Sequence, residues 1–188
     1  SAEGRRGGPH LYSTGGYLDP SWVNRTFWKA GRAQTSGLMV LGDGVAYGME
    51  VYDSRSRETV FRPGANAYRL RCIPLKPSPD DKSASRKRRR RGPAVQWEQH
   101  LAIRVTAMVR AGGTIFVAGS PDVVDADDPH AAWEGRLGGV LAALSADDGG
   151  KLARYPLPAP PAWDGMGVAG ARLLLSTRDG SVVCFRGD

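Results

Sequence analysis

Two clusters of like charge are the residues whose types and spacing could do chemistry. Asp122, Asp125, Asp127 and Asp128 lie close together in the chain, and carboxylate oxygens are ligands that Ca²⁺ prefers. Their spacing does not match the roughly 12-residue calcium-binding loop, because neither the central Gly nor the terminal Glu is in place. An acidic surface loop is the competing interpretation, and pairing with the basic cluster of a neighbouring unit is a third.

The second cluster is a run of six consecutive basic residues, which could bind nucleic acid, another anionic polymer or an acidic partner by counterion release. It has no interleaved aromatic residues for base stacking, and a solvated loop held open by self-repulsion is the competing interpretation. Without these six charges the formal net charge of +7 falls to +1. The candidate polyanion-binding residues are Arg86, Lys87, Arg88, Arg89, Arg90 and Arg91.

Other residues that often carry chemistry give weaker signals. His10, His100 and His130 share no periodic face, which argues against a metal or acid–base role. No nucleophile elbow, phosphate-binding loop or paired metal motif is present, so the sequence predicts no catalytic and no metal-ligating residue. Five tryptophans could stack on a quinone or a sugar, or could lock neighbouring sheets together; these are Trp22, Trp28, Trp97, Trp133 and Trp163.

The two cysteines, Cys72 and Cys184, are too few for a zinc site or a disulfide framework. Both fall on expected strands. We expect them to be buried free thiols that act as small apolar residues, with a single long-range disulfide as the alternative.

Composition points to short strands joined by many turns. Glycine (25) and proline (13) make up about a fifth of the 188 residues, against a usual share of roughly 12%. No apolar stretch approaches the roughly 20 residues that span a membrane. The chain opens on Ser1 without an initiator Met and shows no signal peptide. We therefore expect a piece of a longer protein.

A repeated unit of short apolar strand, glycine turn and second apolar strand indicates the fold. Ala46, Ile115 and Leu173 occupy equivalent positions, at spacings of 69 and 58 residues. Propeller blades repeat at roughly 40–50 residues, so each spacing requires an insertion. The basic insertion covers about 76–92 and an acidic one covers 121–137, the latter with a possible helical turn at 129–134.

The pattern predicts an all-β chain, a partial β-propeller of about three blades of antiparallel strands with two long loop insertions. Three blades cannot close a ring, which typically needs 4–8. The expected domains are an irregular, aromatic N-terminal segment (1–36) and blades over 37–188, divided as 37–103, 104–158 and 159–188, with a disordered basic insertion at about 76–92. The expected strands are 37–41, 45–50, 67–74 and 95–101; 105–110, 114–118, 139–145 and 151–156; and 164–169, 172–176 and 181–186.

The same pattern predicts particular positions. We expect Gly113, Gly149 and Gly180 in turns between strands. We expect the following residues to be buried between blades: Ile115, Val117, Leu141, Leu144, Leu173, Leu175, Val182 and Cys184.

Several of these segments resemble the repeats of quinoprotein-type propellers. Residues 139–152, with an acidic turn before Gly-Lys, look like one such repeat, and 170–185 resembles its preceding half. With 105–124, 163–166 and 18–28, the resemblance extends over most of 10–186 and is closest to the C-terminal blades of PQQ-binding-like β-propeller repeat proteins, which are typically extracytoplasmic bacterial proteins.

The resemblance implies a scaffold, because the cofactor residues of the dehydrogenases do not carry over. In those enzymes a Trp and a vicinal disulfide enclose the quinone and Glu, Asn and Asp hold calcium; this chain has no Cys-Cys pair. We expect a non-catalytic scaffold or binding module in a periplasmic or secreted protein, contacting other protein domains or further blades, with no cofactor of its own. The alternatives are polyanion binding, and the C-terminal part of a quinoprotein oxidoreductase whose missing blades supply PQQ and calcium.

Overall fold

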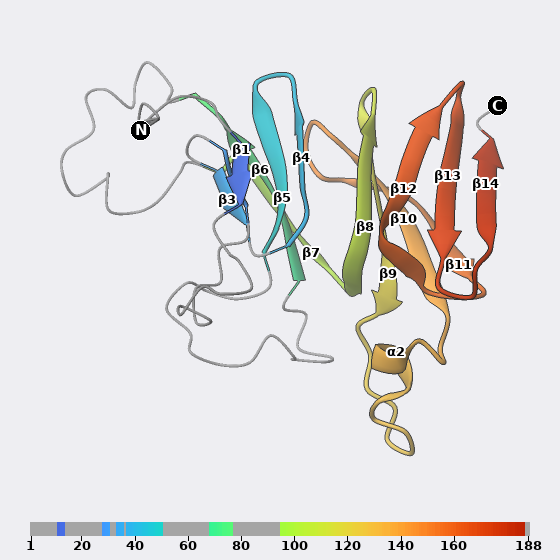
Figure 1. Ribbon diagram of the computed structural model, residues 1–188. Coiled ribbons are helices and arrows are strands. Elements are labelled where there is room, and N and C mark those ends of the chain that lie inside the picture. Colours follow the sequence, from blue (N-terminus) through green and yellow to red (C-terminus); the bar gives the residue numbers. More distant parts are fainter. Residues whose placement is uncertain are drawn as a thin grey trace, which may run out of the picture.

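The computed structural model describes residues 11–13, 28–30, 33–35, 37–50, 68–76 and 95–186. Within these ranges the protein is all-β, as predicted, and its strands form four antiparallel sheets that lie side by side (Figure 1). Among the described residues, no helix has the length and the hydropathy to cross a membrane.

Each sheet is a meander of consecutive strands. Sheet 1 holds β1 (Leu11–Ser13), β2 (Trp28–Ala30) and β3 (Ala33–Thr35). Sheet 2 holds β4 (Met39–Gly42), β5 (Val45–Glu50), β6 (Tyr68–Pro74) and β7 (Trp97–Leu101). Sheet 3 holds β8 (Ile103–Ala111), β9 (Thr114–Pro121), β10 (Gly139–Ser145) and β11 (Lys151–Leu157). Sheet 4 holds β12 (Pro161–Ala169), β13 (Arg172–Thr177) and β14 (Val182–Arg186).

Sheets 2, 3 and 4 have the strands, and the grouping of strands, that the repeated unit predicts. Gly113, Gly149 and Gly180 lie between strands, as expected, and the last two have φ of 74° and 87°, values that favour glycine. Sheet 1 was not predicted, because its three-residue strands are too short to show an alternating pattern. The expected domain boundaries remain a prediction.

Apolar side chains on both faces of the strands hold the sheets together. On β9, Ile115 and Val117 belong to the core shared with sheet 2, whereas Ala118 belongs to the core shared with sheet 4. This alternation follows from the two-residue period of a strand, and it means that sheet 3 is covered on both faces. A smaller cluster of Ala33, Ala46 and Ile73 joins sheet 1 to sheet 2.

The first strands of neighbouring sheets approach one another closely. β8 lies against β12 of sheet 4 and against β4 of sheet 2. β7 and β11 are instead the outermost strands of their sheets. An ion pair between Arg110 on β8 and Asp43 in the β4–β5 turn adds a polar link between sheets 2 and 3.

Six of the eight side chains expected to be buried are at most 7% exposed: Ile115, Val117, Leu141, Leu144, Leu173 and Leu175. Val182 and Cys184 were predicted wrongly, because Val182 is 66% exposed and Cys184 is exposed. In β14 every residue from 182 to 185 is apolar, so the sequence does not say which alternate set faces inward. The structure turns Phe185 toward the core shared with sheet 3, and this places Val182 and Cys184 on the opposite face.

Both cysteines are free thiols, so the alternative of a long-range disulfide is not realised in the structure. Cys72 is buried, as predicted, and its burial raises the pKa of the thiol.

Candidate functional site

A groove lies between sheets 2 and 3 in the described part of the chain. Its floor consists of the buried side chains Leu101, Ile103, Ala142 and Leu144. The volume of the groove is about 340 Å³, which falls in the range of roughly 300–1,000 Å³ that ligand pockets occupy. We call this feature the outer groove, because the outermost strands β7 and β11 both contribute to its lining.

The rim of the outer groove comes from β11, where Lys151, Leu152 and Arg154 line it. β11 pairs with β10 through an irregular register, in which Ala153 lies opposite Ala143 but Lys151 lies opposite Leu144. Leu152 is thus the extra residue of a β-bulge, and a bulge re-aims side chains at the edge of a sheet. Leu152 remains 60% exposed beside the apolar floor.

Trp97 fastens sheet 2 to the turn that precedes β11. The indole N–H of Trp97 donates to the carbonyl oxygen of Ala146 at 3.0 Å, and the hydroxyl of Tyr47 donates to the same oxygen at 3.3 Å. The Trp97 ring packs so closely on Gly149 that an added Cβ there would lie 2.7 Å from Cε3. Trp97 therefore locks two sheets together, the second of the two roles considered for the tryptophans.

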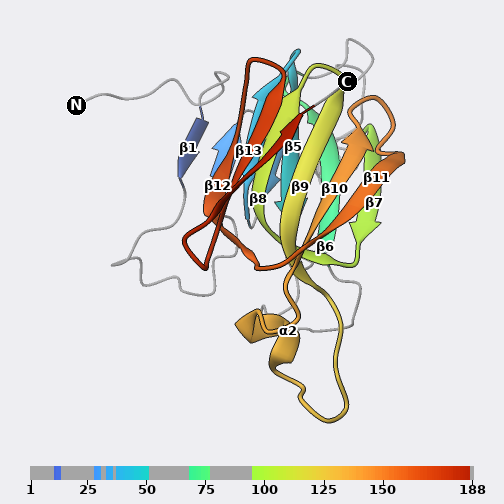
Figure 2. The same ribbon diagram turned by 90° about the vertical axis from the view of Figure 1, so that its right-hand side faces the viewer.

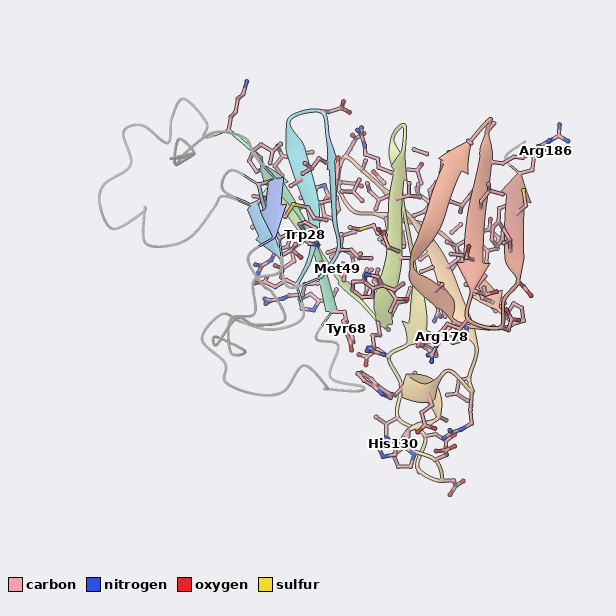
Figure 3. All side chains as sticks on the ribbon, in the orientation of Figure 1. Trp28, Met49, Tyr68, His130, Arg178 and Arg186 are labelled. Atoms are coloured by element: carbon pink, nitrogen blue, oxygen red, sulfur yellow. The ribbon has the colours of Figure 1, made fainter. Side chains whose placement is uncertain are left out.

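A second polar cluster lies at the opposite end of the sheets, where the segment from 122 to 138, called here the α2 loop, extends below the strands with α2 (Ala131–Glu134) (Figure 2). Arg104 stacks on Trp133 of this loop, with Cζ 3.3 Å from the ring centroid. Arg104 also hydrogen-bonds to Tyr68, and burial lowers the pKa of Arg104 while it raises the pKa of Tyr68. Tyr68 and Arg178 mark this end in Figure 3.

The hollow beside Arg104 has a volume of about 10 Å³, close to the space that one water needs. It is lined in part by Tyr68, Asp122 and Trp133. An organic ligand does not fit there. The stack of Arg104 on Trp133 and the hydrogen bond from Arg104 to Tyr68 hold the α2 loop against sheets 2 and 3.

Three of the four aspartates of the acidic cluster make different side-chain contacts. Asp122 is buried beside Arg104, and the carboxylate of Asp125 accepts the backbone N–H groups of Asp127 and Asp128. The carboxylate of Asp128 accepts hydrogen bonds from Nε and Nη2 of Arg136, and these bonds hold the pKa of Asp128 below its usual range. Among the described residues, no three His, Cys, Asp or Glu side chains converge as metal ligands would. The predicted helical turn at 129–134 is present as α2.

The remaining candidates do not come together. His100 lies on β7 within 3.5 Å of Glu98, whereas His130 lies in the α2 loop (Figure 3). Trp163 is 61% exposed on β12. His10, Trp22 and the polyanion-binding candidates at 86–91 lie outside the described residues. Lys76, the first residue of the basic insertion, and Val95, which follows it, lie at the end of sheet 2 opposite the α2 loop. The amide of Leu75 donates to the carbonyl oxygen of Gly44 in the β4–β5 turn, and the amide of Gln96 donates to the carbonyl oxygen of Cys72.

Sequence patterns did not identify the outer groove. Its only local signal is Leu152, an apolar residue between Lys151 and Arg154 on an edge strand. A scan against family models finds no match to the chain, and a search of curated proteins finds none either.

Proposed function

We propose that this protein is a non-catalytic scaffold of about three propeller-like blades that acts through protein–protein contacts. The observation that carries the proposal is the repeated packing of sheets 2, 3 and 4, in which antiparallel meanders stack face to face with their first strands together. Blades of a propeller are four-stranded meanders of this kind.

The proposal extends to the family and the compartment, as part of a larger bacterial PQQ-binding-like repeat protein outside the cytoplasm. It is supported by residues 139–152, which resemble the quinoprotein-type repeat and form β10, a turn and the first two residues of β11. Gly149 of this segment is the residue on which Trp97 of β7 packs, so the repeat-like turn takes part in the contact between sheets 2 and 3.

The outer face of sheet 4 supports further assembly of blades. Leu174 is 40% exposed on β13 and pairs with the exposed Cys184 on β14, while Val182 lies farther along the same face. Sheets 2 and 3 have apolar cores on both faces. Because the free energy falls when apolar surface leaves water, we propose that a further antiparallel sheet of the same protein covers this face.

Thiol labelling tests that assembly in the full-length protein. The expected result is slow modification of Cys184, with faster modification in the Leu174→Asp variant, because a carboxylate next to Cys184 disfavours burial of the face. Cys72, buried in the core between sheets 2 and 3, serves as the internal reference for a protected thiol. Labelling of native Cys184 as fast as in urea-unfolded protein would overturn the proposed coverage.

The oxidoreductase alternative is tested separately. Equilibrium dialysis of the full-length protein against PQQ with Ca²⁺ measures cofactor binding directly. A non-catalytic scaffold retains no quinone, whereas one tightly bound quinone per protein followed by dye-linked alcohol oxidation would replace the scaffold with an enzyme.

A further inference from the structure

The chemistry of the outer groove indicates what it binds. Its floor is apolar: the exposed fractions of Leu101, Ile103 and Leu144 are 2%, 4% and 0%. Its charged rim residues, Lys151 and Arg154, are both cations and both exposed. A molecule that fits must therefore present an apolar group to the floor and negative charge to the rim.

The walls of the outer groove favour an extended chain. In the described part of the chain, β7 and β11 are each the last strand of their sheet, so one edge of each carries backbone N–H and C=O groups that pair with no described strand. An extended peptide can satisfy such groups with its own main chain, while its alternate side chains enter neighbouring pockets. The groove is also partly open to solvent, whereas small ligands are usually enclosed over most of their surface.

The exposed Leu152 supplies the hydrophobic part of the contact. The β-bulge places both Lys151 and Leu152 at the groove, where a regular strand would direct two successive side chains to opposite faces. Leu152 is 60% exposed beside a buried apolar floor, so a partner that covers this side chain is stabilised by the burial of its apolar surface.

We propose that the outer groove binds an extended acidic peptide segment of a partner protein, with apolar side chains on Leu152 above the buried floor and flanking carboxylates on Lys151 and Arg154. The inference rests on the proposed scaffold function and names the partner of its binding surface.

Fluorescence anisotropy with labelled hexapeptides tests the inference on the full-length protein. The probes are Asp-Glu-Leu-Ile-Asp-Glu, Asp-Glu-Leu-Phe-Asp-Glu and Asp-Glu-Phe-Ile-Asp-Glu. A basic control, Lys-Lys-Leu-Ile-Lys-Lys, keeps the apolar pair, and an acidic control, Asp-Glu-Gly-Ser-Asp-Glu, removes it. At least one probe binds with an affinity that falls as salt rises, and neither control binds. Failure of all three probes, or equal binding of either control, overturns the inference.

Two sets of variants locate the binding. Leu152→Ser weakens the bound probe about tenfold, the effect of losing one buried apolar contact of roughly 1.4 kcal/mol. Lys151→Ala with Arg154→Ala weakens it and flattens the salt dependence. The matched controls, Val124→Ser and Arg136→Ala in the α2 loop, change exposed residues that neither line the groove nor belong to the covered face of sheet 4, and they leave affinity unchanged. These are exposed positions, so the variants fold, and equal loss in both sets overturns the assignment to the groove.

Other occupants give different results. If the protein dimerises and Leu152→Ser abolishes the dimer, the groove binds a second copy of the chain instead of a peptide. If millimolar dodecanoate displaces the probe and the displacement does not depend on salt, the groove binds an apolar small molecule instead of a peptide. Failure of peptide binding with Cys184 still protected removes this inference alone, whereas rapid labelling of Cys184 removes the proposed assembly of blades.

Discussion

The indole N–H of Trp97 donates to the carbonyl oxygen of Ala146 at 3.0 Å, across the interface between sheets 2 and 3. The hydrogen bond connects the first residue of β7 to the turn after β10, 49 residues later in the chain. It joins two units that were predicted from local patterns alone, and it lies beside the outer groove.

Removal of the Trp97 contact destabilises the fold. Trp97→Ala lowers the free energy of unfolding by about 3 kcal/mol, through lost packing on Gly149 and lost hydrogen bonding. Trp97→Phe keeps most of the packing and costs about 1 kcal/mol. Urea denaturation followed by circular dichroism measures both, and Trp163→Ala is the matched control, since an exposed substitution stays within about 0.5 kcal/mol. Equal losses for Trp97→Ala and Trp163→Ala would contradict the inter-sheet role.

The α2 loop depends on the stack of Arg104 on Trp133. Cation–π contacts contribute about 0.5–2 kcal/mol, with the larger values for desolvated pairs, and Trp133 is 37% exposed. The planar guanidinium also hydrogen-bonds to Tyr68. Arg104→Lys therefore increases amide hydrogen exchange across 122–138, because an ammonium group cannot stack as a plane. Arg136→Lys, at an exposed ion pair, is the control and has a smaller effect. Unchanged exchange in Arg104→Lys would show that the loop is held in another way.

The strands of sheets 2, 3 and 4 were predictable because glycine turns and two-residue alternation are local signals. The inward face of β14 was not predictable, because its residues show no alternation of apolar and polar side chains: Val182, Val183, Cys184 and Phe185 are all apolar. The contact between Arg104 and Trp133 was also not predicted, because the two residues are brought together only by the long connection between β9 and β10. The outer groove depends on a bulge at Leu152 and on two edge strands from different sheets, and neither has a pattern in sequence.

The Asp128–Arg136 pair makes the α2 loop sensitive to acid. The bond from Arg136 holds the pKa of Asp128 below its ordinary value of 3.8. A carboxyl group with a lowered folded-state pKa stabilises the structure above its unfolded pKa, and this stabilisation is lost as the pH falls through the folded value. Carbon-detected NMR titration shows the lowered midpoint, and Arg136→Gln returns it toward 3.8. The same midpoint with and without Arg136 would remove the pair as the cause.

Two glycines with similar backbones separate strain from steric contact at the sheet interface. Gly149 and Gly180 have φ of 74° and 87°, but an added Cβ meets Trp97 at 2.7 Å only at Gly149. Gly180→Ala therefore costs about 1 kcal/mol, the price of a left-handed alanine, and Gly149→Ala costs more. In a Trp97→Ala background the two substitutions become equal, because the obstructing ring is gone. Thermal and urea denaturation of the four variants measure this coupling, and an excess cost at Gly149 that survives Trp97→Ala would place its origin outside the contact with Trp97.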